Sequence, residues 1–331
     1  DHISSCVQSI LSQTYPAFDL TVVDSASEDA TLDRVPHSAH VRTLRLQDNV
    51  GFATAVNIGL RATESEYVAL VNPDVRVSKD WLFPLIQEME AHGNIGAAMP
   101  KIFLEGRDRT INSDGGRMSF LGFAWAGHNG RPDGGNSEPV NVPYASGAAL
   151  VLRREAVSEV GQLDSSYFLY HEDVDLGLRL WRAGYRSVCV RRASVSHDYA
   201  PWRHLQKIAL LEENRWATIL KNFSLQTLVK ALPFLLLAEA MVVVYCLQRK
   251  QLWLKIVGMA RLLQRLPAIL RERRRLALQL GRDDWIFLRL CDGHLRDALD
   301  EPDRFSSIDA LFHQAYVSFF ALEGGKTPRG S

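Results

Sequence analysis

The segment YVALVNPDVRVSKDWLFPLIQEMEA (residues 67–91) decides the fold, because it joins a predicted strand to a predicted helix. Its first five residues form an apolar run typical of a covered strand, and residues 80–91 repeat apolar side chains at helical spacing. The same alternation recurs along the chain. We predict further strands at 20–24, 41–46, 95–99, 149–152 and 187–190, and further helices at 52–62 and 172–183. The pattern predicts an α/β fold with a largely parallel sheet flanked by helices.

Polar side chains follow two of these strands, at the sheet edge where open α/β folds bind ligands. Asp24 ends the first strand and can accept a hydrogen bond from a base or a ribose, although a turn-forming Asp is the alternative. Asn72 and Asp74 follow residues 67–71 on a predicted turn. An amide oxygen and a carboxylate suit a hard divalent ion that bridges phosphates, and a plain Asn-Pro turn is the alternative.

A second stretch, SSYFLYHEDVDLGLRLWRAGY (165–185), places acidic residues at the start of a predicted helix. Glu172 and Asp173 lie in the first turn, where the partial positive charge of a helix start favours an ionised carboxylate. Asp173 is therefore a candidate general base that does not need a raised pKa. Asp175 is four residues before Arg179, which predicts a structural ion pair. The alternative is that Glu172 and Asp173 only cap and solvate the helix.

Composition excludes some classes of function. The 331 residues carry 38 Lys or Arg and 38 Asp or Glu, so bulk attraction to nucleic acid is not expected. The four cysteines show neither CxxC spacing nor a dense secreted pattern. This usage predicts a reducing compartment and no structural zinc.

The chain changes character after Phe223. Residues 231–247 are apolar except for Glu239, and as a helix they would reach roughly 25 Å, slightly short of a bilayer core of about 30 Å. Residues 252–270 form a predicted amphipathic helix, followed by RERRR at 271–275. Trp253, Ile256 and Leu263 lie on its apolar side, and Lys255, Arg261 and Arg265 lie on a basic side that is expected to face lipid phosphates. Between residues 249 and 289 there are eleven Lys or Arg and three Asp or Glu. We predict contact with an anionic membrane surface, and a soluble helical hairpin is the alternative.

Several motifs in order along the chain resemble the family 2 glycosyltransferases of GT-A fold, especially the rhamnosyltransferase-like branch. The matching motifs are LTVVDSASED (20–29), NVGFATAVNIG (49–59), YVALVNPD (67–74), SGAALVLRRE (146–155), VGQLDSSYFLYHEDVDLGLRLWRAGYR (160–186) and ASVSH (193–197). The resemblance covers roughly residues 3–222. It implies a Rossmann-like catalytic domain at 1–222, followed by a helical membrane-associating region and tail at 223–331.

The resemblance also implies roles for individual residues. Asp173 matches the catalytic base, with Glu172 as a neighbour that orients or binds the acceptor. Asp74 and His197 match the ligands of a Mn²⁺ or Mg²⁺ ion, and Asn72 stands where many members have Asp. The residues that it assigns to the nucleotide-sugar site are Asp24, Asn49, Gly51, Asn57, Asn72 and Asp74.

The implied activity is inverting transfer of a sugar, with dTDP-rhamnose as the leading donor, to a lipid-linked saccharide. Such a reaction belongs to cell-envelope polysaccharide or O-antigen synthesis at the cytoplasmic face of the plasma membrane. A non-catalytic sugar-nucleotide-binding or scaffold protein is the alternative. Members of the family also open with a strand ahead of the helix that starts here near Ile3. We therefore expect the chain to be N-terminally incomplete, with activity in doubt.

Overall fold

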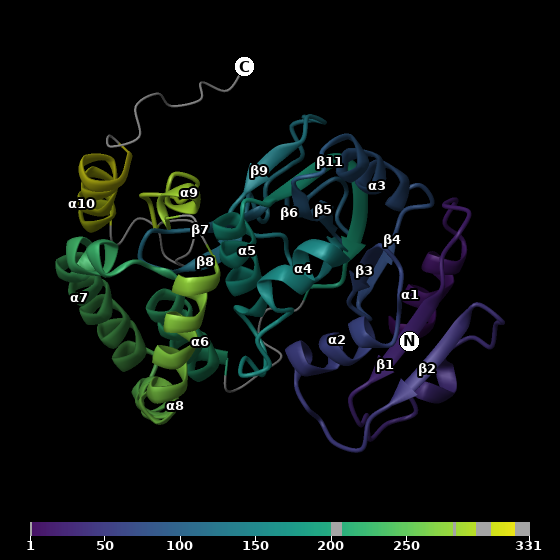
Figure 1. The fold of residues 1–331 in the computed structure, drawn as a ribbon, viewed down its shortest axis with the longest axis horizontal. Helices are drawn as coiled ribbons and strands as arrows, with labels where there is room; N and C mark the ends of the chain where they lie inside the picture. Colours follow the sequence, from purple (N-terminus) through teal and green to yellow (C-terminus); the bar gives the residue numbers. More distant parts are fainter. Residues whose placement is uncertain (1, 200–206, 281–282, 296–305, 322–331) are drawn as a thin grey trace. The chain divides into compact units, whose positions relative to one another are not determined.

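The computed structural model describes residues 2–199, 207–280, 283–295 and 306–321 (Figure 1). The chain divides into two compact units. The first unit comprises Asp1–Gly116, Ala126–Leu180 and Gly184–Pro201. The second comprises Arg117–Trp125, Trp181–Ala183 and Trp202–Ser331. Each unit is described by itself.

A seven-stranded sheet forms the core of the first unit. Its strands are hydrogen-bonded in the order β3-β10-β5-β11-β4, with β6 added to β5 and β9 added to β11. Both β5 and β10 are buried almost throughout, because helices cover the sheet. The bounds are β3 (Tyr67–Val71), β4 (Val75–Val77), β5 (Ile95–Leu104), β6 (Ile111–Ser113), β9 (Val140–Val142), β10 (Ala149–Arg153) and β11 (Arg186–His197).

The prediction of a largely parallel sheet is wrong in one respect. Only β5 and β11 pair in parallel within this sheet, and all its other pairings are antiparallel. The strands β3, β5 and β11 do share one direction, as strand–helix alternation requires. However, β10 lies between β3 and β5 and runs against both. Alternation along the chain gives the direction of successive strands but not which strand inserts between them.

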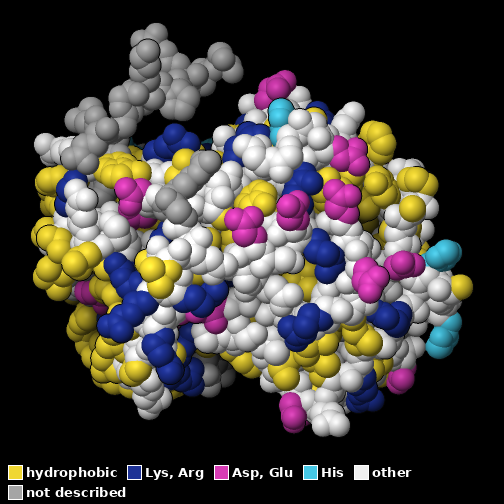
Figure 2. Space-filling view, viewed as in Figure 1, with side chains coloured by type: hydrophobic (Ala, Val, Ile, Leu, Met, Phe, Trp, Pro, Cys, Tyr) yellow, Lys and Arg dark blue, Asp and Glu magenta, His cyan; other side chains and the backbone are white. Residues whose placement is uncertain are grey.

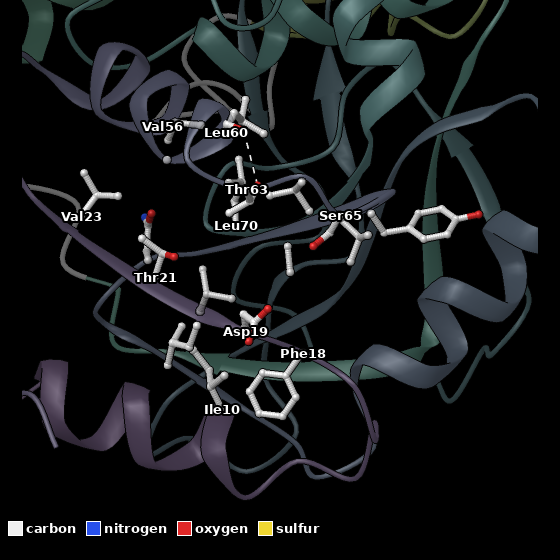
Figure 3. Close-up of a pocket in the computed structure, with 18 of the residues that line it drawn as sticks. Ile10, Phe18, Asp19, Thr21, Val23, Val56, Leu60, Thr63, Ser65 and Leu70 are labelled. Carbon is white, nitrogen blue, oxygen red and sulfur yellow. Dashed lines mark hydrogen bonds between the residues drawn. The ribbon is translucent and has the colours of Figure 1, made fainter. Parts of the chain in front are cut away.

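A separate two-stranded parallel sheet joins β1 (Leu20–Asp24) to β2 (Val41–Arg45). Among the described strands, β1 pairs with β2 alone and β3 with β10 alone. The remaining edges of β1 and β3 line a pocket of about 550 Å³. Figure 3 shows Thr21 and Val23 of β1, Leu70 of β3 and side chains of two helices pointing into it.

Five helices accompany these sheets, and each buries an apolar face. Helix α2 packs on β1, α3 on β11 and β5, and α4 on β10 and β5. Glycine at position 59 of α2 lets the helix approach Val23, because a Cβ there would lie 3.2 Å from that side chain. The bounds are α1 (His2–Leu11), α2 (Phe52–Arg61), α3 (Leu82–Ala91), α4 (Arg154–Val160) and α5 (Glu172–Ala183), with a 3₁₀ turn η1 at Leu32–Arg34.

Helices dominate the second unit. Its helices are α6 (Lys207–Asn222), α7 (Leu225–Gln248), α8 (Leu252–Gln279), α9 (Trp285–Leu288), α10 (Ser306–Tyr316) and a π-helical turn η4 (Val317–Ala321). Residues 117–125 also contribute most of a small sheet, which is formed by β7 (Gly116–Met118) and β8 (Ala124–Ala126). Helices α6 and α8 pack closely along one another. The second unit therefore includes residues 207–222, which the sequence prediction placed in the first domain.

A buried network of charges explains why α6 groups with the later helices. Arg215 of α6 pairs with Glu239 of α7, and Lys255 of α8 pairs with both Glu239 and Glu212. Burial alone would raise the pKa of Glu212, but Arg215 and Lys255 lower it below its ordinary value. Removing one partner from such a network leaves an uncompensated buried charge, so these pairs tie the three helices together.

Candidate functional site

Asp173 lies in the first turn of α5, where two backbone N–H groups hold its carboxylate. Gly147 N–H donates to Oδ2 at 2.9 Å, and Val174 N–H donates to Oδ1 at 2.8 Å. Burial raises the pKa of Asp173 above its ordinary value, and these two hydrogen bonds only partly oppose it. The helix start therefore does not set the pKa of Asp173, because desolvation outweighs its effect. A carboxylate with a raised pKa is well suited to accept a proton.

Glu172 is buried beside Asp173, with 5% of its surface exposed. Its Oε2 atom accepts no hydrogen bond from any residue that the structure describes. Burial raises the pKa of Glu172 well above its ordinary value, and the charge of Asp173 raises it further. The two carboxyls therefore titrate as a pair, and Glu172 holds a proton more readily than an exposed Glu does. This arrangement leaves a polar oxygen available to a bound molecule.

The turn that precedes this pair has an unusual backbone. Tyr170 and His171 have φ angles of 71° and 68°, a left-handed conformation that costs about 1–2 kcal/mol for each non-glycine residue. Two such residues in succession redirect the chain immediately before Glu172. The C=O of His171 then accepts a hydrogen bond from Asp175 N–H at 2.9 Å, which begins α5. Strained residues of this kind cluster at functional sites.

Asp175 and Arg179 form the ion pair that their spacing predicted. Arg179 Nε donates to Asp175 Oδ2 at 2.8 Å, and both side chains are buried. Arg179 also donates to the C=O of Val160 at 2.8 Å. This pair joins α5 to the end of α4 and has a structural role.

Asp74 and His197 come together from distant parts of the sequence. His197 Nε2 lies 3.3 Å from Asp74 Oδ1, because β11 and β4 pair antiparallel and set His197 opposite Val75. On the other side of the imidazole, His197 Nδ1 lies 3.0 Å from Asn112 Oδ1. An amide oxygen can only accept, so Nδ1 carries a hydrogen, and Nε2 is the ring nitrogen that faces Asp74.

This donor set fits a divalent cation. A carboxylate oxygen and an imidazole nitrogen 3.3 Å apart suit Mn²⁺ or Mg²⁺, and the contact of Nδ1 with Asn112 leaves Nε2 as the nitrogen that would bind metal. Within the described residues, no cluster of three His, Cys, Asp or Glu side chains joins them. Positions for phosphate oxygens and water would therefore remain open. Asn72 lines the pocket near Asp74, and its backbone N–H donates to Ala148 C=O at 2.9 Å.

Asp24 is buried at the end of β1, with 5% of its surface exposed. Its Oδ1 accepts a hydrogen bond from Ser27 N–H at 3.2 Å, so the residue does form a turn. Its Oδ2 lies 3.7 Å from Arg45 Nε but accepts no hydrogen bond from the described residues. One oxygen therefore shapes the loop, and the other remains able to accept a hydrogen bond from a ligand.

Asn49 and Gly51 organise the start of α2. Asn49 Oδ1 accepts the N–H of Gly51 at 3.1 Å, and both residues line the pocket. The resemblance assigned Gly51 to the nucleotide-sugar site. The structure places the backbone of Phe168 beside Gly51: Phe52 N–H donates to Phe168 C=O at 2.7 Å. Gly51 therefore packs the 163–171 segment against α2.

Asn57, which the resemblance assigned to the donor site, makes structural hydrogen bonds. Its side chain is buried in α2, where Nδ2 donates to Leu163 C=O at 2.7 Å and to Ser165 Oγ at 3.2 Å. Its Oδ1 accepts Leu163 N–H at 3.1 Å. These bonds occupy the amide, so Asn57 fixes the loop that leads to Asp173 and offers nothing to a donor.

Comparison with known proteins agrees with this geometry. The family model described as glycosyl transferase family 2 matches residues 1–161. An N-acetylglucosaminyl-diphospho-decaprenol L-rhamnosyltransferase of Mycobacterium tuberculosis is 30% identical over 223 residues, which cover 60% of this chain and 72% of the relative. The chain belongs to glycosyl transferase family 2.

Two further proteins are similar to this glycosyltransferase at lower sequence identity. The O-antigen biosynthesis protein RfbC of Myxococcus xanthus is 25% identical over 233 residues, covering 65% of this chain and 18% of the relative. Among solved structures, GalNAc-T7 with UDP, GalNAc and Mn²⁺ has a TM-score of 0.53 at 16% identity, covering 65% of this chain and 44% of that one. The predicted GT-A fold class is confirmed.

Two positioning residues of the glycosyltransferase were missed by sequence reasoning. Gly147 lies within the motif SGAALVLRRE, which assigns it no role, although its N–H holds Asp173. Asn112 lies in the short strand β6, and its side chain contacts His197 Nδ1. A short polar residue in a long connection carries no local signal, so only the tertiary contacts identify it.

Replacing Gly51 by Ala is expected to destabilise the glycosyltransferase by about 1–3 kcal/mol. Gly51 has φ +79°, and a Cβ at this position would lie 2.6 Å from Phe168 O. Thermal unfolding followed by circular dichroism measures the loss. Gly93→Ala is the matched control, because a Cβ at Gly93 would have no heavy atom within 4 Å and should leave the unfolding transition unchanged. Equal transitions for both variants would contradict the expectation.

Proposed function

We propose that this glycosyltransferase catalyses a single inverting displacement in which Asp173 is the general base. The observation that carries the proposal is the position of Asp173: two N–H groups fix its half-buried carboxylate beside the buried Glu172 at the start of α5. Asp173 accepts the proton of an acceptor hydroxyl as that oxygen attacks the anomeric carbon. The bond from that carbon to the nucleoside diphosphate breaks on the opposite face, so the configuration inverts. Glu172 supplies a hydrogen bond to the acceptor.

We further propose that Asp74 and His197 hold a Mn²⁺ or Mg²⁺ ion, with Asn112 fixing the imidazole. Such an ion, when bound, offsets the charge that builds up on the departing nucleoside diphosphate. Asp24 and Asn49 bind the nucleoside portion of the donor. The exposed Asn49 and the unshared oxygen of Asp24 support this assignment.

The proposed donor is dTDP-rhamnose and the proposed acceptor is a polyprenyl-diphosphate-linked saccharide at the cytoplasmic face of the membrane. The name of the mycobacterial relative supports rhamnose as the sugar and a polyprenyl-diphosphate-linked saccharide as the acceptor, and that of RfbC supports a role in O-antigen synthesis. Incubation of the purified protein with dTDP-, UDP- and GDP-sugars, followed by measurement of nucleoside diphosphate release, tests the donor. Release from UDP-sugars alone would overturn the choice of rhamnose.

Contact with a membrane is proposed from the exposed faces of α7 and α8. Helix α7 presents a stripe of exposed apolar residues, comprising Leu225, Val229, Leu232, Leu236, Val244 and Leu247. Helix α8 presents a second stripe, comprising Trp253, Ile256, Leu263 and Leu270. Figure 2 shows hydrophobic side chains beside Lys and Arg over the surface where Figure 1 places these helices. Two such stripes match a helix pair lying in the bilayer interface.

The orientation of α8 revises the predicted mode of contact. The sequence predicted that Lys255 and Arg265 face lipid phosphates, but Lys255 is buried against Glu212 and Glu239, and Arg265 pairs with Glu213 of α6. The apolar residues Trp253, Ile256 and Leu263 face outward instead. Attachment through these stripes is driven mainly by apolar burial, with Arg271, Arg274 and Arg275 near the end of α8 adding attraction to phosphates.

Helix α7 has the length and composition of a membrane span, with 24 residues and a mean hydropathy of 2.0 in its most apolar window. Its single acidic residue, Glu239, is however paired with Arg215 and Lys255, and its Oε1 accepts Trp216 Nε1–H at 3.0 Å. A spanning α7 would have to abandon these partners. We therefore propose that α7 lies along the membrane surface with its stripe inserted.

The double variant Leu232→Lys/Leu236→Lys is expected to bind neutral phosphatidylcholine vesicles at least about tenfold more weakly than the wild type, because each change removes an inserted apolar side chain. Flotation with vesicles in high salt measures this binding. Phe83→Lys is the control, since Phe83 is an exposed apolar residue on α3 of the first unit. Wild-type protein that floats only with anionic vesicles at low salt would contradict insertion.

A further inference from the structure

We propose that a pocket in the helical unit binds the diphosphate of a lipid-linked acceptor, an inference that rests on the acceptor class proposed above. The pocket has a volume of about 460 Å³ and lies where the start of α7 meets the last turns of α8. Three cationic side chains line it: Arg182 in the last turn of α5, Lys221 at the end of α6, and Arg273 of α8. None of them belongs to the predicted catalytic or metal site.

The described side chains that line the pocket carry an excess of positive charge. Among the described residues that line the pocket, the anionic ones are Asp283 and Asp284, so three cations there face two carboxylates. Asp284 is also engaged by α7, since Ser224 N–H donates to its Oδ2 at 2.7 Å. Burial lowers the pKa of Arg182; Asp284 opposes this effect and the charge of Arg273 adds to it. Two partly desolvated guanidinium groups near one another favour the entry of an anion.

The first turn of α7 adds further donors. Ser224 is the N-cap residue, and its Oγ accepts Thr227 N–H at 3.1 Å. Ser224 and Leu225 line the pocket, so the partial positive charge at the start of this 24-residue helix lies beside it. Together with the arginines they resemble the mixture of guanidinium and backbone donors that binds phosphate groups in proteins.

The apolar surroundings indicate that the phosphate belongs to a lipid. Leu225 lines the pocket and is also the first residue of the exposed α7 stripe, with 70% of its surface exposed. On α8, Ala277 lines the pocket and its neighbour Leu278 is 90% exposed. The charged pocket therefore opens directly onto an apolar surface. A ligand with an anionic head and a hydrocarbon tail matches both parts, whereas a soluble phosphate matches only the first.

Binding to vesicles tests the proposal without any glycosyl transfer. The probe is a phosphatidylcholine vesicle that contains a small fraction of polyprenyl diphosphate, compared with vesicles that contain the same fraction of polyprenol. We expect the intact chain to bind the diphosphate vesicles about tenfold more tightly, the effect of a charge-assisted contact. Equal binding to both kinds of vesicle would overturn the proposal.

A pair of adjacent arginines gives a matched control. Arg273→Gln should remove most of the preference for diphosphate vesicles, whereas Arg274→Gln should retain it, because Arg274 is exposed and does not line the pocket. Arg273→Lys, which keeps the charge, should restore part of the preference. Circular dichroism checks folding, since Arg273 also donates to Leu220 C=O at 2.6 Å. Equal losses in Arg273→Gln and Arg274→Gln would mean that only bulk charge acts, which contradicts a specific pocket.

Two further measurements separate the possible causes of failure. Calorimetric titration with inorganic diphosphate should show much weaker binding than the vesicles, and equal strength would assign the pocket to a soluble anion and overturn the lipid proposal. The Asp173→Asn variant should keep the full preference for diphosphate vesicles, since Asp173 does not line the pocket. If the wild type prefers diphosphate vesicles but transfers no sugar, the proposed function alone is refuted. If the wild type transfers sugar but shows no preference for diphosphate vesicles, the proposed pocket alone is refuted.

Discussion

Replacing Asp173 by Asn is expected to reduce sugar transfer by about 10²–10⁴-fold, the contribution typical of a positioned general base. The amide cannot accept the proton of the acceptor hydroxyl. Steady-state assays of nucleoside diphosphate release with a saturating donor measure the rate. Donor binding, followed as the increase in unfolding temperature on adding the sugar nucleotide, should be nearly unchanged. Turnover close to that of the wild type would remove Asp173 from the role of base.

The pH profile distinguishes this role from a structural one. Burial raises the pKa of Asp173 and of Glu172, so the wild-type rate should fall as the pH drops through a value above the ordinary Asp range. The base must be deprotonated to act, and protonation at low pH removes it. The residual activity of Asp173→Asn should lack this acidic limb. Glu172→Gln should lower the rate by a smaller factor, because Glu172 is proposed to give the acceptor a hydrogen bond, whereas Asp173 takes the proton.

Removal of divalent metal is expected to abolish transfer, with activity returning on addition of Mn²⁺ or Mg²⁺. The physical reason is that the bound cation offsets the negative charge that develops on the departing diphosphate. Without the cation, the side chains of Asp74 and His197 do not supply that compensation. Activity assays after treatment with a chelator test this. Full activity in the presence of chelator would exclude both residues from a metal site.

Asn112 provides a sharper test of the same site. Asn112→Ala should raise the metal concentration required for half-maximal activity by about 10–100-fold, because the imidazole of His197 loses the partner that orients it. Asn129→Ala is the control: Asn129 accepts a hydrogen bond from Asn112 Nδ2 at 3.3 Å but does not contact His197. A change in the maximal rate with no change in metal dependence would contradict the positioning role.

Much of the candidate site was predictable from local patterns. Apolar runs located β1 and β3 within a residue, and the polar residues that follow them identified Asp24 and Asp74. The start of α5 at Glu172 matched the prediction because an acidic first turn and an apolar face are local properties of the sequence. Spacing along one helix likewise predicted the pair of Asp175 and Arg179.

Other features depend on contacts between distant segments. The insertion of antiparallel β10 between β3 and β5 depends on edge pairing, which strand propensity does not encode. The raised pKa of Asp173 depends on how deeply α5 is covered, and no count of neighbouring charges predicts burial. Asn57 looked like a ligand residue in its motif, yet the 163–165 loop occupies its amide.

Helix α8 shows most clearly what the sequence determines and what only the tertiary structure decides. The sequence determined that residues 252–270 form an amphipathic helix with Lys255 and Arg265 on one side and Trp253, Ile256 and Leu263 on another. Only the tertiary structure decided which side faces inward. The acidic residues Glu212 and Glu213 of α6 attract the basic side, so the apolar side remains exposed. Periodicity fixes the faces of a helix, but its partners decide which face is buried, because a buried charge requires an opposite charge beside it.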